Sequence, residues 1–456
     1  MSLKPVPRKP VSQPRAAVEP AAAPPARAAT PRGEAMYALV RELYPICRSI
    51  TGNGVRQTLE ILGRQVPLSL TELPTGADVL DWTVPKEWNI KGGWIQRLNG
   101  ERVLDFSSSN LHVLNYSTPV PRRRISRAEL EPHLHSLPEQ PDWVPYRTSY
   151  YAERWGFCLS QRQREALTDA EYEICIDATL EPGHLTYAES VIPGTSTDEI
   201  VLTAHICHPS LCNDNLSGIS IATFLLQELQ KQPQRYTLRV LFIPGTIGSI
   251  AWLSQNRERA ASIKHGLSLV CLGDDSPFTY KRTLHGSREV DRVLSYALEA
   301  SKLPWQVIDY FPYGYDERQF NSPGFGLPVG SLMRGQHGKF PEYHTSADNL
   351  SFVSPERLEE SLELCLSAVG MLNDNRRFQN LRPYGEPQLG KRGVYRALGG
   401  TDIADTQLAL FWVLALSDGQ NDLLQIAQRS SLPFAVIRDA ALILERQELL
   451  AAVTGQ

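Results

Sequence analysis

Residues 200–218 read Ile-Val-Leu-Thr-Ala-His-Ile-Cys-His-Pro-Ser-Leu-Cys-Asn-Asp-Asn-Leu-Ser-Gly. The apolar run 200–202 predicts a buried strand, and the apolar periodicity of 219–229 predicts a helix. A strand, a polar loop and a helix in this order form a βα unit. Because open α/β sheets bind ligands at the carboxyl ends of their strands, we expect a functional site at this loop.

The loop carries two imidazoles and a carboxylate within ten residues, a combination that zinc binds readily. His205 stands where the strand would end, His208 follows three residues later, and Asp214 lies between two asparagines. A plainer interpretation is equally open, because Asp214 would also suit the cap of the following helix. Cys207 and Cys212 are available as soft ligands, but the role of small buried side chains is favoured for both.

The composition is that of a soluble globular protein of two or three domains, with 456 residues, 42% of them hydrophobic and 21% charged. A net charge of −4 favours neither nucleic acid nor a membrane as partner. The sequence has no apolar run of ~18 residues and no secretory signal pattern. Seven scattered cysteines argue against a disulfide framework, so we expect a cytoplasmic protein.

The first half of the chain changes character twice. Residues 1–33 are rich in Pro, Ala and Arg and predict a disordered arm, whereas 34–65 have helical spacing on both sides of a turn at 51–54. From 66 to 180 short β-like runs dominate. These are Gly93–Leu98 and Arg102–Phe106, joined by an Asn-Gly hairpin signal, then Leu111–Tyr116, and a strand pair predicted at Tyr172–Ala178 and His184–Val191.

Residues 198–375 alternate apolar strands with helices, the rhythm of a doubly wound sheet. The expected strands are Ile200–Ala204, Thr237–Ile243, Leu267–Leu272, Thr279–Leu284 and Pro328–Leu332, and the expected helices are 217–231, 247–261, 288–302 and 355–373. We therefore predict an α/β core at 34–68 and 180–378, interrupted by a mainly-β domain at 69–179.

Residues 384–456 form a separate unit with three short amphipathic helices at 408–416, 423–429 and 434–446. Three helices of this length predict a winged-helix-like domain. DNA binding would require a basic recognition helix, but Arg438 and Arg446 are balanced by neighbouring acidic residues. Nucleic acid is therefore disfavoured, and a protein-contact or homo-oligomer module is the preferred interpretation.

Other polar segments follow later strands of the predicted sheet. Asp274 and Asp275 come after one strand, but adjacent side chains face oppositely, so at most one would reach a given site. His344 lies in a polar loop before the helix at 355, where it would complete a His, Asp, His set around an open zinc. Asp348 would form a hydrogen bond that orients the His344 ring, or it would cap the turn.

Four sequence segments resemble those of the co-catalytic zinc aminopeptidase superfamily, which also contains glutamate carboxypeptidases and glutaminyl cyclases. They are Val201-Leu-Thr-Ala-His205, Asn213-Asp-Asn-Leu-Ser-Gly218, Ile247-Gly-Ser249 and Tyr343-His-Thr-Ser-Ala-Asp348. From about residue 36 onward the chain resembles, more closely, a bacterial family of aminopeptidase-like proteins with an inserted β-rich domain and a C-terminal winged helix. That match is carried by Tyr44-Pro-Ile-Cys-Arg-Ser-Ile-Thr-Gly-Asn-Gly54, Cys207-His-Pro-Ser-Leu-Cys-Asn-Asp-Asn-Leu-Ser-Gly218 and Leu389-Gly-Lys-Arg-Gly393.

The resemblance implies a zinc-exopeptidase-like core and assigns its metal ligands by position. His205 matches the first metal histidine, Asp214 the bridging aspartate and His344 the last metal histidine, and Asp274 falls near a later carboxylate ligand. His208 has no counterpart in the wider superfamily, so it is a candidate replacement for a ligand that is lost.

The chain departs from the superfamily pattern at Gly245 and Thr246. The superfamily has two consecutive glutamates there, the first a general base and the second a ligand of a second metal. We therefore expect one zinc rather than two, and a hydrolase without its usual base, whose help is typically worth ~10²–10⁴ in rate. Asp275, Asp316, Glu317 and His208 are the candidates for a replacement base.

The resulting hypothesis is a zinc-dependent hydrolase of an amide bond in a small aminoacyl or peptide-like substrate, with Tyr343 or Arg318 stabilising the oxyanion. Zinc that polarises a carbonyl as a Lewis acid would still work without a base. The alternative is a catalytically inactive binding or scaffold protein, which the absence of a glutamate at Gly245 favours.

Overall fold

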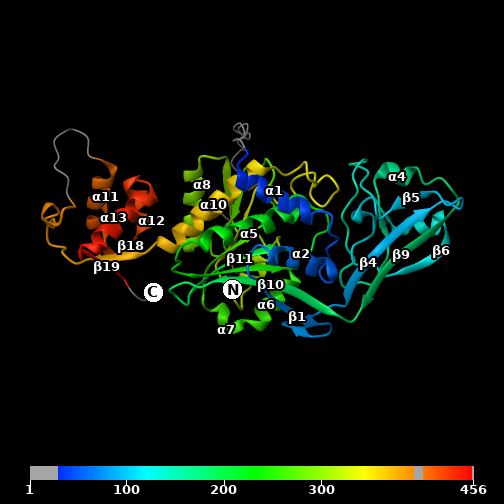
Figure 1. Ribbon diagram of the computed structural model, residues 1–456, viewed down its shortest axis with the longest axis horizontal. Helices are drawn as coiled ribbons and strands as arrows, with labels where there is room; N and C mark the ends of the chain where they lie inside the picture. The colour runs from blue at the N-terminus through cyan, green and yellow to red at the C-terminus, as the bar shows by residue number, and fades with distance from the viewer. Residues whose placement is uncertain (1–28, 395–403, 454–456) are drawn as a thin grey trace, which may run out of the picture.

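An eight-stranded mixed sheet runs through the middle of the molecule (Figure 1). The computed structural model describes residues 29–394 and 404–453. The strand order is β1-β10-β12-β11-β13-β16-β14-β15, with β12, β11, β13 and β16 mutually parallel and β10 and β14 antiparallel beside them. The strands are β1 (Ser69–Pro74), β10 (His184–Ile192), β11 (Glu199–His205), β12 (Thr237–Ile243), β13 (Ile263–Leu269), β14 (Phe278–Lys281), β15 (Trp305–Ile308) and β16 (Val329–Met333).

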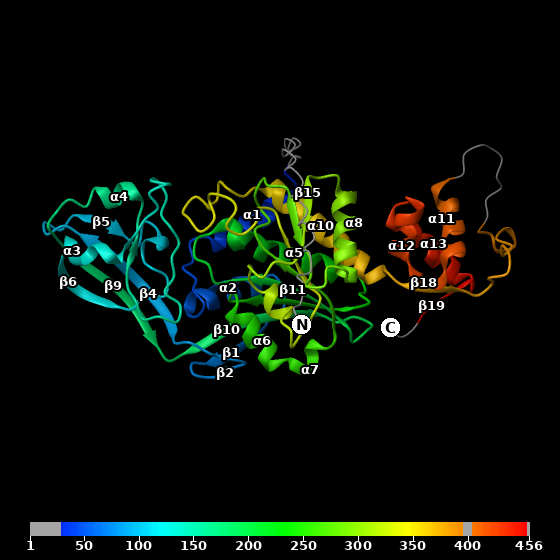
Figure 2. The same cartoon turned by 180° about the vertical axis from the view of Figure 1, so that it is seen from behind.

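The central strand β11 is buried on both faces, which explains its continuous apolar sequence. Ile200 and Leu202 point into the core beneath one helical layer, and Val201 points into the core on the opposite face. The first layer contains α1 (Pro31–Leu43), α2 (Asn53–Gly63), α5 (Gly218–Leu229), α8 (Glu289–Ser301) and α10 (Pro355–Asp374). The second contains α6 (Ile247–Gln255), α7 (Arg257–Ala260) and α9 (Glu317–Phe320), and the reverse view shows the sheet between the two layers (Figure 2).

A second, antiparallel sheet forms the β-rich unit at one end of the molecule (Figure 1). Its order is β5-β4-β9-β6, from β4 (Glu87–Gln96), β5 (Arg102–Asp105), β6 (Val120–Ser126) and β9 (Glu171–Glu181). The Asn-Gly signal does join the hairpin β4–β5. Residues 111–116, expected as a strand, instead hold a 3₁₀ turn (Asn110–His112) and an irregular segment.

The pairing expected between 172–178 and 184–191 is wrong. β9 pairs with β4 and β6, whereas β10 pairs with β1 and β12 of the central sheet. The Glu-Pro-Gly sequence between them is therefore the crossing from one sheet to the other and not a hairpin. A local turn signal does not specify the long-range register that decides this choice. For the same reason β1 lies in the central sheet, although its residues were expected in the inserted domain.

The C-terminal unit has the three expected helices, α11 (Asp405–Leu416), α12 (Leu423–Ser430) and α13 (Phe434–Arg446). They pack against a small sheet of order β18-β17-β19, made of β17 (Arg377–Asn380), β18 (Asp418–Asp422) and β19 (Leu450–Ala452). Because β17 belongs to this sheet, the unit begins at about residue 376, earlier than the predicted 384.

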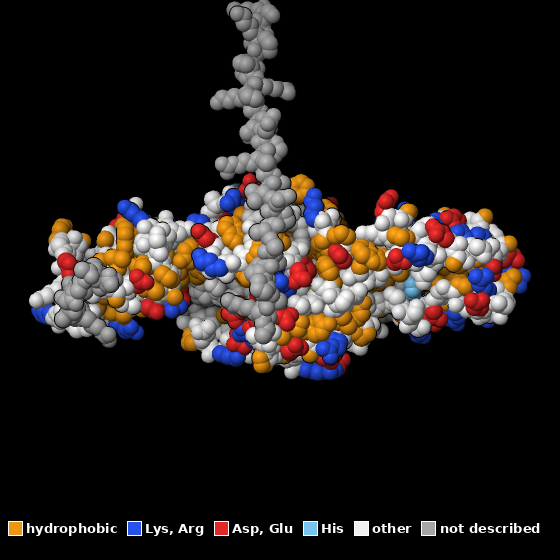
Figure 3. Space-filling model, turned by 90° about the horizontal axis from the view of Figure 1, so that it is seen from above, with side chains coloured by type: hydrophobic (Ala, Val, Ile, Leu, Met, Phe, Trp, Pro, Cys, Tyr) orange, Lys and Arg blue, Asp and Glu red, His pale blue; other side chains and the backbone are white. Residues whose placement is uncertain are grey.

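The N-terminal boundary also differs from the prediction. Helix α1 starts at Pro31 with Thr30 as its cap, so residues 31–33 are helical, and the predicted arm up to residue 28 lies outside the described residues. Within the described ranges, no helix is both long and apolar enough to cross a membrane. On the face in Figure 3, basic and acidic side chains are interspersed along the length of the molecule.

A buried ion-pair cluster holds three strands of the central sheet together. Arg239 of β12, 2% exposed, donates from Nε and Nη2 to Glu199 of β11 at 2.7 and 2.8 Å. Its Nη1 lies 2.9 Å from Glu189 of β10. Removing one partner of a buried ion pair leaves an uncompensated charge in the interior.

We predict that Arg239→Met lowers the free energy of unfolding by about 3–5 kcal/mol, measured by urea denaturation, because Glu199 loses its counter-charge. Arg282→Met is the control, since its pair with Asp309 is exposed and should contribute less than about 1 kcal/mol. A loss at Arg239 no larger than at Arg282 would contradict the assignment.

Candidate metal centre

The loop after β11 is fastened to the segment that follows β13. Asn213 donates from Nδ2 to Asp274 Oδ2 at 2.6 Å and accepts from Gly273 N at 2.8 Å. Asn215 donates to Leu269 O at 2.9 Å, and the Ser217 hydroxyl accepts from Leu272 N at 2.9 Å. The polar residues of this loop therefore bond to a neighbouring strand end and do not cap α5.

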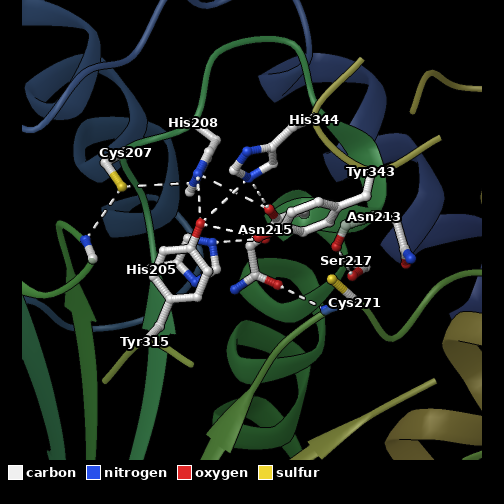
Figure 4. A network of polar contacts seen from close by, with 12 residues as sticks. His205, Cys207, His208, Asn213, Asn215, Ser217, Cys271, Tyr315, Tyr343 and His344 are labelled. Carbon is white, nitrogen blue, oxygen red and sulfur yellow. Dashed lines mark hydrogen bonds and ion pairs between the residues drawn. The ribbon is translucent and has the colours of Figure 1, made fainter. Parts of the chain in front are cut away.

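The three histidines converge on the carboxylate of Asp214, which is completely buried. His205 Nε2 lies 2.9 Å from Asp214 Oδ1, and His344 Nε2 lies 2.9 Å from Oδ2. His208 Nε2 is 3.9 Å from Oδ2. The imidazoles of His208 and His344 turn toward a common centre, with the ring of Tyr315 over that of His205 (Figure 4).

His344 is held in place by the inserted unit. Tyr146 N donates to His344 O at 2.7 Å, and Ser346 N donates to Val144 O at 2.8 Å, so the segment 144–146 pairs alongside the His344 loop. The ring of Tyr146 packs edge-on against both His208 and His344, with centroids 5.1 Å away in each case. The insert thus supplies one wall of the site.

His208 is held from the other side by the segment between α1 and α2. Arg48 Nε donates to the His208 carbonyl at 2.8 Å, and its Nη1 donates to Leu43 O at 2.7 Å. Burial lowers the pKa of Arg48 to about 10, which leaves the guanidinium charged near neutral pH. This anchor accounts for an arginine that is 0% exposed.

Burial and charge set the ionisation of the cluster. Burial lowers the pKa of His208 well below its usual value, so this imidazole is neutral at pH 7. Burial raises the pKa of Asp214, but the positive charge that His208 and His205 carry when protonated, together with the hydrogen bonds from His205 and His344, holds this pKa well below its usual value. Burial raises the pKa of the Cys207 thiol to about 12, and its sulfur accepts from Gly245 N at 3.2 Å. Cys207 thus behaves as a small buried side chain.

Asp348 supports the cluster from behind, but through a different contact from the one expected. Its two carboxylate oxygens accept from Asn213 N at 2.6 Å and from Asp214 N at 3.0 Å. It therefore positions the backbone of the loop that carries Asp214 and not the ring of His344. Burial raises the pKa of Asp348 to about 8, despite these two backbone hydrogen bonds.

The two consecutive aspartates after β13 are not part of the cluster. Asp274 accepts from Asn213 Nδ2 and, at 3.1 Å, from Gly335 N, and its other oxygen accepts from Ser276 N. The side chain of Asp275 is 83% exposed and pairs with Arg357. As expected, the two side chains point in different directions, but neither reaches the histidines.

Two other candidate bases are also engaged elsewhere. Asp316 Oδ1 accepts from Thr246 N at 3.0 Å and from the Ser249 hydroxyl at 2.6 Å, and burial raises its pKa. Glu317 is fully buried and forms an ion pair with Lys281. Neither carboxylate lines the cavity that opens above the histidines.

That cavity has a volume of about 520 Å³, within the range of small-molecule sites. Its lining combines His208, Gly245, Thr246, Tyr315, Arg318 and His344 with residues of the inserted unit, among them Trp82, Tyr146, Arg147, Tyr150 and Tyr151. Tyr343 stacks on His344 at a centroid distance of 3.9 Å, and its hydroxyl lies 3.3 Å from that of Tyr315.

Sequence reasoning missed three residues of this site. Tyr315 directly precedes Asp316 and Glu317, which the sequence offered as candidate bases, but nothing singled out its own side chain. Tyr146 comes from the inserted unit, and only the long-range pairing of 145 with 345 brings it here. His337 is a further buried histidine, whose ring centroid is 5.4 Å from that of Tyr315. A Gly-Gln-His-Gly sequence was the only signal for it.

The donor set fits a metal ion. The ligand atoms of His205, His208 and Asp214 lie within 4.8 Å of one another, and His344 contacts the same carboxylate. Neutral imidazoles and an ionised carboxylate are the forms in which these groups bind metal. Nitrogen and carboxylate donors together are typical of zinc. Burial of the two facing imidazoles of His205 and His208 is hard to explain by packing alone, because His205 Nδ1 has no hydrogen-bond partner among the described residues.

The fold is that of the zinc aminopeptidases. A zinc aminopeptidase from Bacillus subtilis superimposes with a TM-score of 0.56, covering 76% of this chain and 96% of its own, at 14% identity. A crystal structure from Clostridium acetobutylicum, provisionally described as a peptidase, superimposes with a TM-score of 0.87 at 48% identity, over 92% of this chain and 96% of its own.

The chain belongs to the family described as a domain of unknown function, DUF4910, whose model matches residues 37–375. A winged helix-turn-helix model matches residues 376–452, in agreement with the boundary at β17. A relative from C. acetobutylicum is 49% identical over 422 residues, which is 92% of this chain and 97% of the relative. It is provisionally named a polysaccharide biosynthesis protein with an aminopeptidase-like domain.

We predict that Asp348→Asn weakens zinc binding by about 10–100-fold, because groups that orient metal ligands typically contribute that much. The amide of Asn would place a donor against the two backbone N–H groups that Asp348 now accepts from. Competition with a chromophoric chelator measures the affinity. Asp275→Asn is the matched control and should bind zinc like the unmodified protein, since its side chain is exposed. Equal affinities in the two variants would show that Asp348 has no role in the site.

Proposed function

We propose that this protein is a metal-dependent hydrolase of an amide bond in a small peptide-like substrate. The observation that carries the proposal is the buried Asp214 carboxylate, shared by His205 and His344 beside His208 at the floor of a cavity. One zinc ion would be held by ligands drawn from these four side chains. When bound, it would polarise the scissile carbonyl and lower the pKa of a water molecule.

The residues around the cavity indicate that the rate of hydrolysis should be low, because they include no obvious general base. Gly245 has no side chain to take a proton, and the carboxylates of Asp275, Asp316 and Glu317 do not line the cavity. Of the candidate bases only His208 lies at the metal centre, where it is a ligand. We therefore expect slow hydrolysis, lower by about 10²–10⁴ than with a positioned general base.

The charge of the cavity suggests the substrate. Among the described residues that line it there is no carboxylate to receive a free α-amino group, and two guanidinium groups, Arg147 and Arg318, face no acidic partner within 4 Å. Arg318 Nε is buried without a hydrogen-bond partner. A guanidinium binds a carboxylate through two parallel hydrogen bonds. We propose that the substrate carries an anionic group beside the scissile amide.

The first experiment measures zinc by plasma mass spectrometry together with amide hydrolysis in the full-length protein. We predict about one zinc per chain and a slow, chelator-sensitive hydrolysis. His208→Ala should lose most of the zinc and the activity, whereas His285→Ala, an exposed histidine, should keep both. Protein without zinc, even after zinc is added, would refute the proposal.

The same assay tests the alternative, an inactive binding protein, which the missing carboxylates at Gly245 and Thr246 favour. The informative variant is Gly245→Glu, which keeps Tyr315; a Cβ at position 245 would lie 3.1 Å from the Tyr315 ring, so the ring must shift by a few tenths of an ångström. Hydrolysis in the variant alone supports the binding protein. Hydrolysis in both proteins supports the proposed enzyme.

We predict that Arg318→Gln raises KM for an anionic substrate at least about tenfold, since a charge-assisted pair is worth roughly 1.5–3 kcal/mol. The matched substrates are a dipeptide with a free carboxylate and the same dipeptide with a C-terminal amide. The amide should be a poor substrate for the unmodified protein and should be unaffected by the substitution. Equal effects on both substrates would exclude recognition of charge by Arg318.

A further inference from the structure

Tyr315 fills the space that a side chain at position 245 would need. A Cβ on Gly245 would lie 3.1 Å from Cδ1 and 3.3 Å from Cε1 of Tyr315, closer than side chains normally pack. The ring lies flat on His205, with centroids 4.7 Å apart and planes 14° from parallel. The Tyr315 ring therefore occupies its present position with least crowding when residue 245 has no side chain.

The orientation of the ring carries its hydroxyl past His205 and into the cluster (Figure 4). Tyr315 Oη is 3.3 Å from His208 Nε2 and 3.3 Å from His344 Nε2. Asp214 Oδ2 is 2.9 Å from the same atom of His344 and 3.9 Å from that of His208. Four potential ligand atoms, two nitrogens and two oxygens, thus surround one point.

The two distances from Tyr315 Oη to the imidazole nitrogens match those between ligands of a common ion, whereas Asp214 Oδ2 and His344 Nε2, at 2.9 Å, are at hydrogen-bond distance. Zinc bonds to nitrogen and oxygen are about 2.0–2.2 Å, so tetrahedral ligand atoms lie roughly 3.3–3.6 Å from one another. A hydroxyl that makes a good hydrogen bond is nearer, at roughly 2.7–3.0 Å. Tyr315 Oη is 3.3 Å from three different partners, the third being the Tyr343 hydroxyl, and is close to none of them.

We propose that Tyr315 is a ligand of the metal, together with His208, Asp214 and His344. The phenol would bind as the phenolate, with its proton released to solvent. The phenolate and the Asp214 carboxylate would then balance the two charges of the ion. The proposal rests on the metal centre of the proposed function, to which Tyr315 would add a second protein oxygen.

The test uses iron(III) as a spectroscopic probe, because phenolate bound to iron(III) has a strong charge-transfer absorption in the visible range. Iron(III) nitrilotriacetate is added to metal-free full-length protein, and the absorption and the resonance Raman spectrum are recorded. We predict a visible band with tyrosinate ring modes. Tyr315→Phe removes one oxygen atom and should abolish the band and weaken zinc binding at least about tenfold, and circular dichroism checks that the variant is folded.

Tyr343→Phe is the matched control. The Tyr343 hydroxyl is also near the cluster, at 3.3 Å from the Tyr315 hydroxyl. This variant should keep the band. A band that survives in Tyr315→Phe and disappears in Tyr343→Phe overturns the inference. Metal bound by the unmodified protein without a band also overturns it and leaves the hydrolase proposal standing, whereas failure to bind zinc or iron overturns both. Metal binding without a band in the unmodified protein overturns the inference even where a variant is unstable, and a stable Tyr343→Phe that keeps the band supports it.

Discussion

The carboxylate of Asp214 is a negative charge in the interior of the molecule, and the surrounding structure is arranged to keep it ionised. Burial by itself would protonate it. Two imidazole nitrogens at 2.9 Å and a third at 3.9 Å oppose that effect. The backbone N–H of Asp214 is in turn held by Asp348. Imidazole and carboxylate groups gathered in this way are the side chains that commonly bind zinc.

The residues that hold this carboxylate and its histidines in place come from several segments of the central unit and from the insert. The loop after β11 carries Asp214, the segment after β13 receives Asn213 and Asn215, and Arg48 fixes His208. The segment 144–146 pairs with the His344 loop. The β-rich unit is therefore part of the site and not a separate module on the surface. Its aromatic residues form the wall of the cavity that distinguishes this molecule from a bare aminopeptidase core.

The sequence predicted most of the central sheet, because buried strands and amphipathic helices have local patterns that survive without knowledge of partners. It also predicted that His205, His208, Asp214 and His344 would meet, since strand ends in one sheet lie at one edge. The pairing of strands could not be predicted in the same way. The sequences of β9 and β10 predicted a hairpin, but the two strands belong to different sheets. Asp274 illustrates a further limit, since its side chain is turned away by hydrogen bonds to Asn213 and Gly335 that no spacing rule predicts.

The charge of the site connects the lack of carboxylates at positions 245 and 246 with the position of Tyr315. A centre with two further carboxylates at positions 245 and 246 would have the negative charge to hold two divalent ions. With Gly245 and Thr246, Asp214 is the one carboxylate among the described residues that touches the three imidazoles. A Cβ at position 245 would lie 3.1 Å from the Tyr315 ring, so the glycine gives this ring room beside the cluster. If the centre holds one divalent ion, the proposed Tyr315 phenolate would supply the second negative charge, and the lack of a carboxylate at 245 and the position of the ring would be parts of one arrangement.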